Sequence, residues 1–174
     1  MNSVIIYGGH YGTTKAYAEK LSEKTGISMM NYKEIKDLSA YEQVIHLGGL
    51  YAGGVTGLKN TLKVLPQNTK LVIVTVGIAD VTIKENIDNI RQSIRMQVPK
   101  DIYEKASIFH LRGGIDYGNL NFLHKTMMKM VYSKVKKMPE EQKTPEDKEL
   151  MATYNQKVDY MDFDSLEQII KNIS

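Results

Sequence analysis

Cysteine does not occur in this chain of 174 residues. Its absence excludes disulfide bonds, iron–sulfur clusters held by thiolates and thiol redox chemistry, so a redox role requires a bound organic cofactor. Long apolar runs are also missing, because the longest, Leu71 to Ala79, is too short for a bilayer-spanning helix of about 20 residues. No basic-then-apolar leader pattern opens the sequence. We therefore expect a cytoplasmic protein, with peripheral contact at the inner face of the membrane as an alternative.

A strong excess of one charge is absent as well. The chain has 23 Lys and Arg against 20 Asp and Glu, a net charge of +3 at pH 7. The excess is local: residues 118–138 contain five lysines and no acid, whereas residues 139–149 contain five acids and two lysines. Aromatic residues are not interleaved with the lysines as a stacking surface would need, so nucleic-acid binding is disfavoured.

Strand and helix patterns alternate along the chain. β-branched and apolar runs predict strands, and apolar residues at helical spacing predict helices between them. This alternation predicts an α/β fold with a five-stranded, doubly wound parallel sheet in a single domain over residues 1–174. The expected strands are 3–7, 27–30, 44–47, 71–76 and 106–111, and the expected helices are 13–25, 56–64, 82–97 and 163–173.

The first strand runs into a glycine-rich turn, Gly9-His10-Tyr11-Gly12-Thr13-Thr14, which opens a helix. Such a turn aims backbone N–H groups and the positive end of the helix dipole at one point, which favours a phosphate. No acid precedes Glu19 to repel it. The dinucleotide pattern does not match, because His10 and Thr13 stand where two of its glycines belong. The order of Gly12-Thr13-Thr14-Lys15 is also wrong for a nucleoside-triphosphate loop.

Two further loops follow predicted strands and are rich in small residues. They are residues 48–55 and residues 77–82. Ligands of open α/β sheets bind outside the carboxyl ends of the strands, where these loops and the first one meet. The three loops together predict a site for a flat phosphorylated ligand.

The hydroxyl-containing turn that ends in Gly12-Thr13-Thr14 resembles the phosphate loop of the flavodoxin family. The resemblance implies the strand order 2-1-3-4-5 and FMN as the cofactor. It places the FMN phosphate on Gly9, His10, Tyr11, Gly12, Thr13 and Thr14, and the flavin ring between Gly49, Leu50, Tyr51, Ala52, Gly53 and Gly77, Ile78, Ala79, Asp80. Tyr51 is the expected stacking residue. The sequence departs from the family at Gly9 and Tyr11, where hydroxyl residues are usual, and has no aromatic residue in 77–82.

A basic and charged insertion at about 112–158 precedes the last predicted helix. Its arrangement is similar to that of the flavodoxin-type, menaquinone-dependent protoporphyrinogen dehydrogenases. This resemblance implies an FMN-dependent oxidoreductase that passes electrons from a small-molecule substrate to a quinone. A flavodoxin-like electron carrier that docks on a redox partner protein is the alternative, and the acid-free loop 43–58 weighs against it. A ligand-free interaction module is a third possibility.

Residues 119–138 predict an amphipathic helix. Its apolar stripe comprises Leu120, Leu123, Met127, Met130, Val131, Val135 and Met138, with lysines opposite. The stripe either packs on the domain, or contacts an anionic membrane surface or a large planar substrate. The four histidines lack metal-ligand spacing. The sequence therefore identifies no metal site. Flavin chemistry needs no protein nucleophile, so we name no catalytic residue either.

Overall fold

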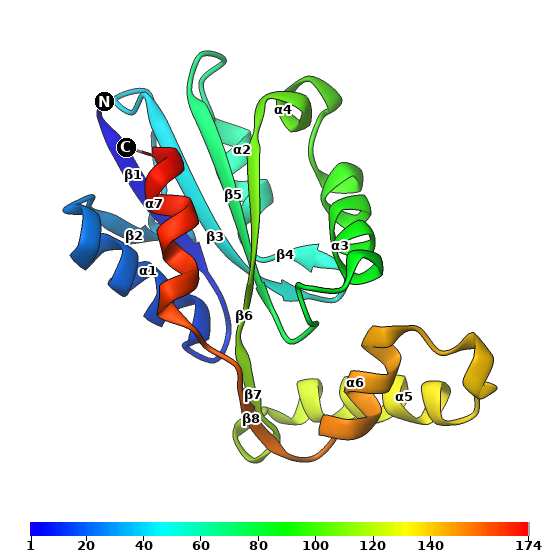
Figure 1. The fold of residues 1–174 in the computed structure, drawn as a ribbon. Coiled ribbons are helices and arrows are strands. Elements are labelled where there is room, and N and C mark those ends of the chain that lie inside the picture. The colour runs from blue at the N-terminus through cyan, green and yellow to red at the C-terminus, as the bar shows by residue number, and fades with distance from the viewer. Residues whose placement is uncertain (174) are drawn as a thin grey trace.

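Five parallel strands form the central sheet of the computed structural model, which describes residues 1–173 (Figure 1). Their order is β2-β1-β3-β5-β6, and all four neighbouring pairs are parallel. This is the predicted doubly wound order 2-1-3-4-5, which is confirmed. The strands are β1 (Ser3–Gly8), β2 (Met29–Asn31), β3 (Gln43–Tyr51), β5 (Lys70–Gly77) and β6 (Ser107–Arg112).

Alternate side chains of the strands enter two separate cores, one on each face of the sheet. Ile5 of β1 packs with Tyr17 and Leu21 from α1 (Thr13–Thr25) and with Ile169 from α7 (Glu167–Ile173). The other core joins neighbouring strand residues to α2, α3 and α4. Their bounds are α2 (Leu58–Val64), α3 (Lys84–Gln97) and α4 (Lys100–Lys105). Because both faces are covered, β5 is apolar along almost its whole length.

The second predicted loop, residues 48–55, is a β-hairpin rather than a loop. β3 continues to Tyr51 and pairs antiparallel with β4 (Gly54–Val55). Ala52 and Gly53 at the tip have φ of 49° and 76°, as both central residues of a type I′ turn require. The amide of Val55 donates to the Gln97 side chain at 3.0 Å, which fixes the hairpin to α3. The small residues of this segment are therefore those of a tight turn.

The insertion forms a lobe beyond the carboxyl ends of the strands (Figure 1). β7 (Gly114–Asp116) and β8 (Lys157–Asp159) pair as its two-stranded antiparallel stem. Between them lie α5 (Phe122–Lys136) and α6 (Pro145–Thr153). The ring of Tyr132 on α5 stacks on Tyr154 with centroids 3.9 Å apart. Single turns of 3-10 helix occur at Tyr32–Glu34, Tyr117–Asn119, Glu140–Gln142 and Phe163–Leu166.

The expected apolar face of the 119–138 helix is split in the structure. Leu120 and Val135 are buried, but Leu123, Met130 and Val131 are exposed. Of the two alternatives for the stripe, packing on the domain is therefore wrong for the last three residues. The physical reason is that α6 and the sheet-end loops cover only one side of α5, so the stripe is wider than the surface available to bury it. Among residues 1–173, no helix combines the length and apolar character that a membrane crossing requires.

Candidate functional site

The first loop presents unpaired backbone donors at the start of α1. Gly12 precedes the helix with φ of 91°, and no side chain caps the helix. Within residues 1–173, no acceptor takes a hydrogen bond from the amides of residues 9–15, and the first helical bond runs from Ala16 to the Gly12 carbonyl. Unpaired amides at the positive end of a helix favour a bound anion. Gly9 keeps the turn close to Thr14, because a Cβ at Gly9 would lie 2.8 Å from the Thr14 Oγ1.

A cavity of about 440 Å³ lies between the sheet-end loops and the insertion. This volume is within the range of small-molecule sites. The wall on the sheet side is formed by His10, Tyr11, Thr13, Thr14, Gly49, Leu50, Tyr51, Ala52, Val76, Gly77, Ile78, Ala79 and Gly113. The wall on the insertion side is formed by Gly114, Ile115, Tyr117, Leu120, His124, Met127, Met128, Val131, Glu146, Asp147, Glu149, Leu150 and Thr153.

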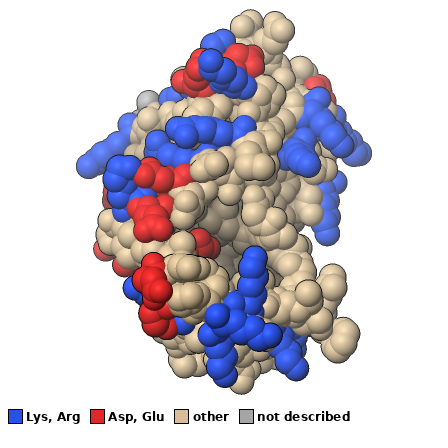
Figure 2. Space-filling view, turned by 90° about the vertical axis from the view of Figure 1, so that its right-hand side faces the viewer, with Lys and Arg blue, Asp and Glu red and all other residues tan. Residues whose placement is uncertain are grey.

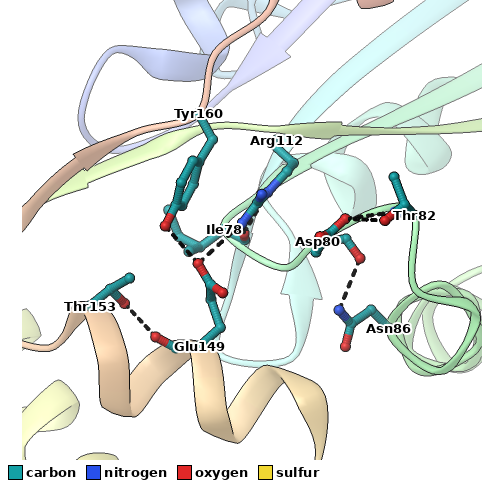
Figure 3. Close-up of polar contacts among 8 residues, drawn as sticks. All are labelled: Ile78, Asp80, Thr82, Asn86, Arg112, Glu149, Thr153 and Tyr160. Carbon is teal, nitrogen blue, oxygen red and sulfur yellow. Dashed lines mark hydrogen bonds and ion pairs between the residues drawn. The ribbon is translucent and has the colours of Figure 1, made fainter.

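Most of the residues predicted for the site line this cavity. Four predicted residues are not part of its wall: Gly9, Gly12, Gly53 and Asp80. Gly53 lies at the hairpin tip, and the Asp80 carboxylate accepts hydrogen bonds from the amide and hydroxyl of Thr82 at 2.9 and 2.7 Å (Figure 3). These bonds lower the pKa of Asp80, so its charge is used within its own loop.

Gly77 allows the second and third loops to pack tightly against each other. A Cβ at Gly77 would lie 2.8 Å from Cδ1 of Leu50. Since both residues line the cavity, a larger residue at position 77 would push the floor of the site apart. The small residue at this position is thus required by the close approach of the Leu50 side chain.

Four aromatic rings join the first loop to α5. Tyr51 lies 4.7 Å from the ring of His10 and 4.6 Å from that of buried His124. The Tyr11 hydroxyl is hydrogen-bonded to His124 Nδ1 and accepts a bond from the Asn121 amide at 3.2 Å. His10 and Tyr11, predicted as phosphate-loop residues, therefore contact the insertion with their side chains. Burial, and then the neighbouring His124, lower the pKa of His10, which favours the neutral form of this ring.

Leu120, Met127 and Val131 of the predicted 119–138 stripe line the cavity, but the sequence did not indicate that β7 and α6 complete the wall on the insertion side. The apolar part of this wall is Ile115, Tyr117, Leu120, Met127, Met128, Val131 and Leu150, and its acidic part is Glu146, Asp147 and Glu149. The segment Thr144-Pro145-Glu146-Asp147 forms a capping box that starts α6, and this pattern was available in the sequence as a helix signal. The position of α6 over the cavity could not be predicted from the sequence, because it depends on the path of the β7–β8 stem.

Arg112, at the end of β6, joins the core around the central sheet to α6 (Figure 3). Its guanidinium donates two hydrogen bonds to the Ile78 carbonyl, at 3.0 and 2.9 Å, and one to Glu149 Oε1 at 3.2 Å. The Tyr160 hydroxyl donates to the same carboxylate oxygen at 2.7 Å, and the Tyr160 ring lies 3.8 Å from the guanidinium carbon. The bond to Glu149 raises the pKa of Tyr160. One side chain thus holds the third loop and the insertion together.

The remaining two histidines, His46 and His110, are buried and hydrogen-bonded within the core. His46 is bonded to the Thr61 hydroxyl at 2.9 Å and the Thr56 carbonyl at 3.0 Å. A carbonyl can only accept, so His46 Nε2 carries the proton and Nδ1 accepts from Thr61. His110 is bonded to the Thr75 hydroxyl at 2.7 Å. No group of three or more His, Asp or Glu side chains suited to a metal ion occurs within the described residues 1–173.

Fold and site together define a doubly wound α/β protein with a cavity and unpaired backbone amides at the carboxyl edge of its sheet. The family model described as "Flavodoxin domain" matches residues 4–143. The chain belongs to this family. FMN is the cofactor of flavodoxins, and the residues present fit it: unpaired amides and two threonines for the phosphate, and a cavity lined by Gly49–Ala52 and Gly77–Ala79 for the ring.

Several solved structures are similar to this chain. A flavoprotein in complex with FMN from Lactobacillus acidophilus NCFM is 15% identical, with 64% of this chain and 92% of that chain covered and a TM-score of 0.41. A cysteine-to-alanine mutant of flavodoxin from Pseudomonas aeruginosa is 14% identical, with coverages of 75% and 93% and a TM-score of 0.41. A flavodoxin from the domain Archaea is 15% identical, with coverages of 63% and 84% and a TM-score of 0.39. A search of curated proteins found no match.

Proposed function

We propose that this protein is an FMN-dependent oxidoreductase that passes electrons through the bound flavin to a flat, uncharged acceptor of the quinone type. FMN supplies the ability to take up and release one or two electrons. The observation that carries the proposal is the shared cavity, because the sheet-end loops form one wall and the insertion forms the other. An electron carrier needs an exposed flavin edge for its partner, whereas a flavin bound in this cavity would be covered by α5 and α6, which contribute residues to its wall.

In this proposal, different groups of the protein bind the phosphate, the flavin ring and the second substrate. The amides of residues 9–15 and the hydroxyls of Thr13 and Thr14 hold the phosphate, since both threonines line the cavity. Tyr51 packs against the flavin ring, with its hydroxyl donating to Met127 Sδ at 3.3 Å. The half-buried Met127 and Met128 adapt their flexible thioethers to a second planar molecule.

Charge in the insertion wall favours an acceptor without carboxylates. Three acids of α6 line the cavity, and none of the described residues that line it is Lys or Arg. Within residues 1–173, Glu149 is the one of these three acids with a cationic partner, Arg112. A neutral quinone is not repelled by the α6 carboxylates, so the acceptor fits beside α6. Because the arrangement is similar to that of the flavodoxin-type protoporphyrinogen dehydrogenases, the donor in this proposal is a porphyrinogen, bound with its carboxylates directed away from α6.

The acceptor is tested by anaerobic stopped-flow mixing of the reduced, FMN-loaded protein with menadione or with cytochrome c. We expect menadione to reoxidise the flavin faster, and Leu150→Trp, which fills the cavity from α6, to slow that reaction at least tenfold. Ala152→Trp is the matched control, because Ala152 is exposed on the same helix and outside the cavity wall. Faster oxidation by cytochrome c, unaffected by Leu150→Trp, would favour the electron carrier.

The donor is tested separately. Protoporphyrinogen IX and menadione are mixed with the FMN-loaded protein, and porphyrin fluorescence is followed. Enzyme-dependent fluorescence that Leu150→Trp abolishes supports the porphyrinogen. A rate equal to that of the spontaneous oxidation removes this donor and leaves the acceptor result standing.

A further inference from the structure

The outer face of α5 exposes large apolar side chains close together. Phe122 is 86% exposed, Leu123 63% and Met130 68%. Positions 122, 123 and 130 fall on one face of α5, because the helix has 3.6 residues per turn. This face is opposite to the one that carries buried His124 and Val135. A cluster of this kind is uncommon on a surface that faces only water, and it indicates a binding surface.

The same face is basic. Lys129, Lys134 and Lys137 line a shallow groove beside Met130, together with Thr126 and Ser133. None of the five lysines of residues 118–138 has an ion-pair partner anywhere in residues 1–173. Figure 2 shows basic side chains gathered on the lower lobe, with a smaller acidic group beside them. Unneutralised lysines around exposed apolar residues combine the two attractions that an anionic lipid surface offers.

We infer that α5 is an interfacial helix that attaches this protein to anionic lipid bilayers. Phe122, Leu123 and Met130 enter the boundary between headgroups and acyl chains, and the groove lysines contact lipid phosphates. A second copy of the chain is a poor occupant, because it would bring lysines against lysines. Glu146, Asp147 and Glu149 of α6 lie in the cavity wall, on the side of α5 away from the exposed cluster, so they do not oppose contact of that cluster with an anionic surface.

The attachment would bring the cavity close to the bilayer. The inner side of α5 contributes His124, Met127 and Met128 to the cavity wall, while its outer side carries the exposed cluster. The inference itself does not depend on a flavin or on a quinone, because it rests on the exposed face alone.

The test is co-sedimentation of the full, FMN-loaded chain with phosphatidylcholine vesicles that contain or lack phosphatidylglycerol, at low and at high salt. We expect binding only to the anionic vesicles, weakened by salt. One lysine at such a surface contributes a factor of about five to the partition coefficient, so Lys129→Gln/Lys134→Gln/Lys137→Gln should lose about a hundredfold. Phe122→Ser/Leu123→Ser/Met130→Ser should lose at least tenfold.

A matched control variant lies on the core domain. Lys84, Lys100 and Met96 are exposed on or beside α3 and α4, and Lys84→Gln/Lys100→Gln/Met96→Ser should bind vesicles as the wild type does. Circular dichroism and thermal melting check that each variant folds. Equal binding to neutral vesicles, equal losses in the control variant, or no binding by the wild type would overturn the inference. Self-association abolished by the α5 variants would assign the face to a second copy instead.

Discussion

At the scale of single residues, Gly12 sets the backbone geometry at the start of α1. Its φ of 91° is strained for any residue with a side chain, although a Cβ there would meet no atom within 4 Å. Gly26 at the end of α1 has the same properties, with φ of 72° and open space. Gly12→Ala and Gly26→Ala should each lower the free energy of unfolding by about 1 kcal/mol.

Only Gly12→Ala should also weaken FMN binding, by at least tenfold in calorimetry, because it reorients the unpaired amides that we propose for the phosphate. Gly26→Ala controls for backbone strain. If both variants bind FMN as the wild type does, the first loop does not hold the phosphate.

Two buried histidines make stability depend on pH. Burial lowers the pKa of His46 and of His110 to about 4, and the unfolded value is about 6.5. The unfolded chain therefore binds more protons between pH 6.5 and 4, so stability is complete above this window and falls as the pH is lowered through it. Each histidine should reduce the free energy of unfolding by about 2 kcal/mol between about pH 7 and pH 5.

Urea unfolding at about pH 7 and pH 5 measures this loss. His46→Gln should be less stable than the wild type at neutral pH, yet lose less stability on acidification. An unchanged pH dependence in this variant would show that His46 does not carry the effect.

The sequence predicted which residues lie at the site, but not the direction in which their side chains point. Spacing placed Thr13, Thr14 and Tyr51 at one edge of the sheet, and the structure shows them in one cavity wall. His10 and Tyr11 come from the same loop, but their rings turn to His124 of α5. Nothing local to the loop indicates a partner 113 residues away.

At the scale of elements, hydrophobic periodicity predicted most helices and strands. It did not predict the structure of segments whose conformation or burial depends on tertiary contacts. The run Leu71–Val76 is apolar on both faces and was correctly assigned to a central strand. Residues 48–55 looked like a loop because of their glycines, but the Gln97 side chain of α3 holds them as a hairpin. In α5 the apolar residues were identified, whereas which of them are covered depends on the position of α6.

The contact between α6 and the core should depend on one charged group. Arg112 is about one-fifth exposed and Glu149 about one-quarter, at 21% and 28% of their side chains, so their bond is partly shielded from water. Glu149→Gln should lower the free energy of unfolding by about 1–2 kcal/mol and loosen α6. Hydrogen exchange in residues 145–153 measures the loosening.

The exposed pair of Lys84 with Asp88 is the control for this prediction. Asp88→Asn should change stability by less than about 0.5 kcal/mol and leave α6 exchange unchanged. Equal exchange in α6 of Glu149→Gln and the wild type would mean that other contacts hold the insertion.

At the scale of the whole molecule, one cavity is built by two parts of the chain that are distant in sequence. The sheet order and the three loops at its carboxyl edge follow from the alternation of strands and helices, so this half could be predicted. The insertion half could not, because β7 and β8 set its position, and neither has a strong strand signal of its own.

A ligand that fills the cavity should therefore stabilise both halves together. FMN at a concentration of about 100 times its Kd should raise the free energy of unfolding by about 2.7 kcal/mol, a rise in Tm of about 5–10 °C for a domain of this size. Hydrogen exchange should slow in residues 9–15 and also in α5, because His124 and Met127 line the same cavity. Tyr11→Phe, which removes the hydroxyl bonded to His124 and Asn121, should keep most of the protection at residues 9–15 and lose that in α5. Protection confined to residues 9–15 in the wild type would mean that the insertion does not close the flavin site, and the route for a second substrate between them would be lost.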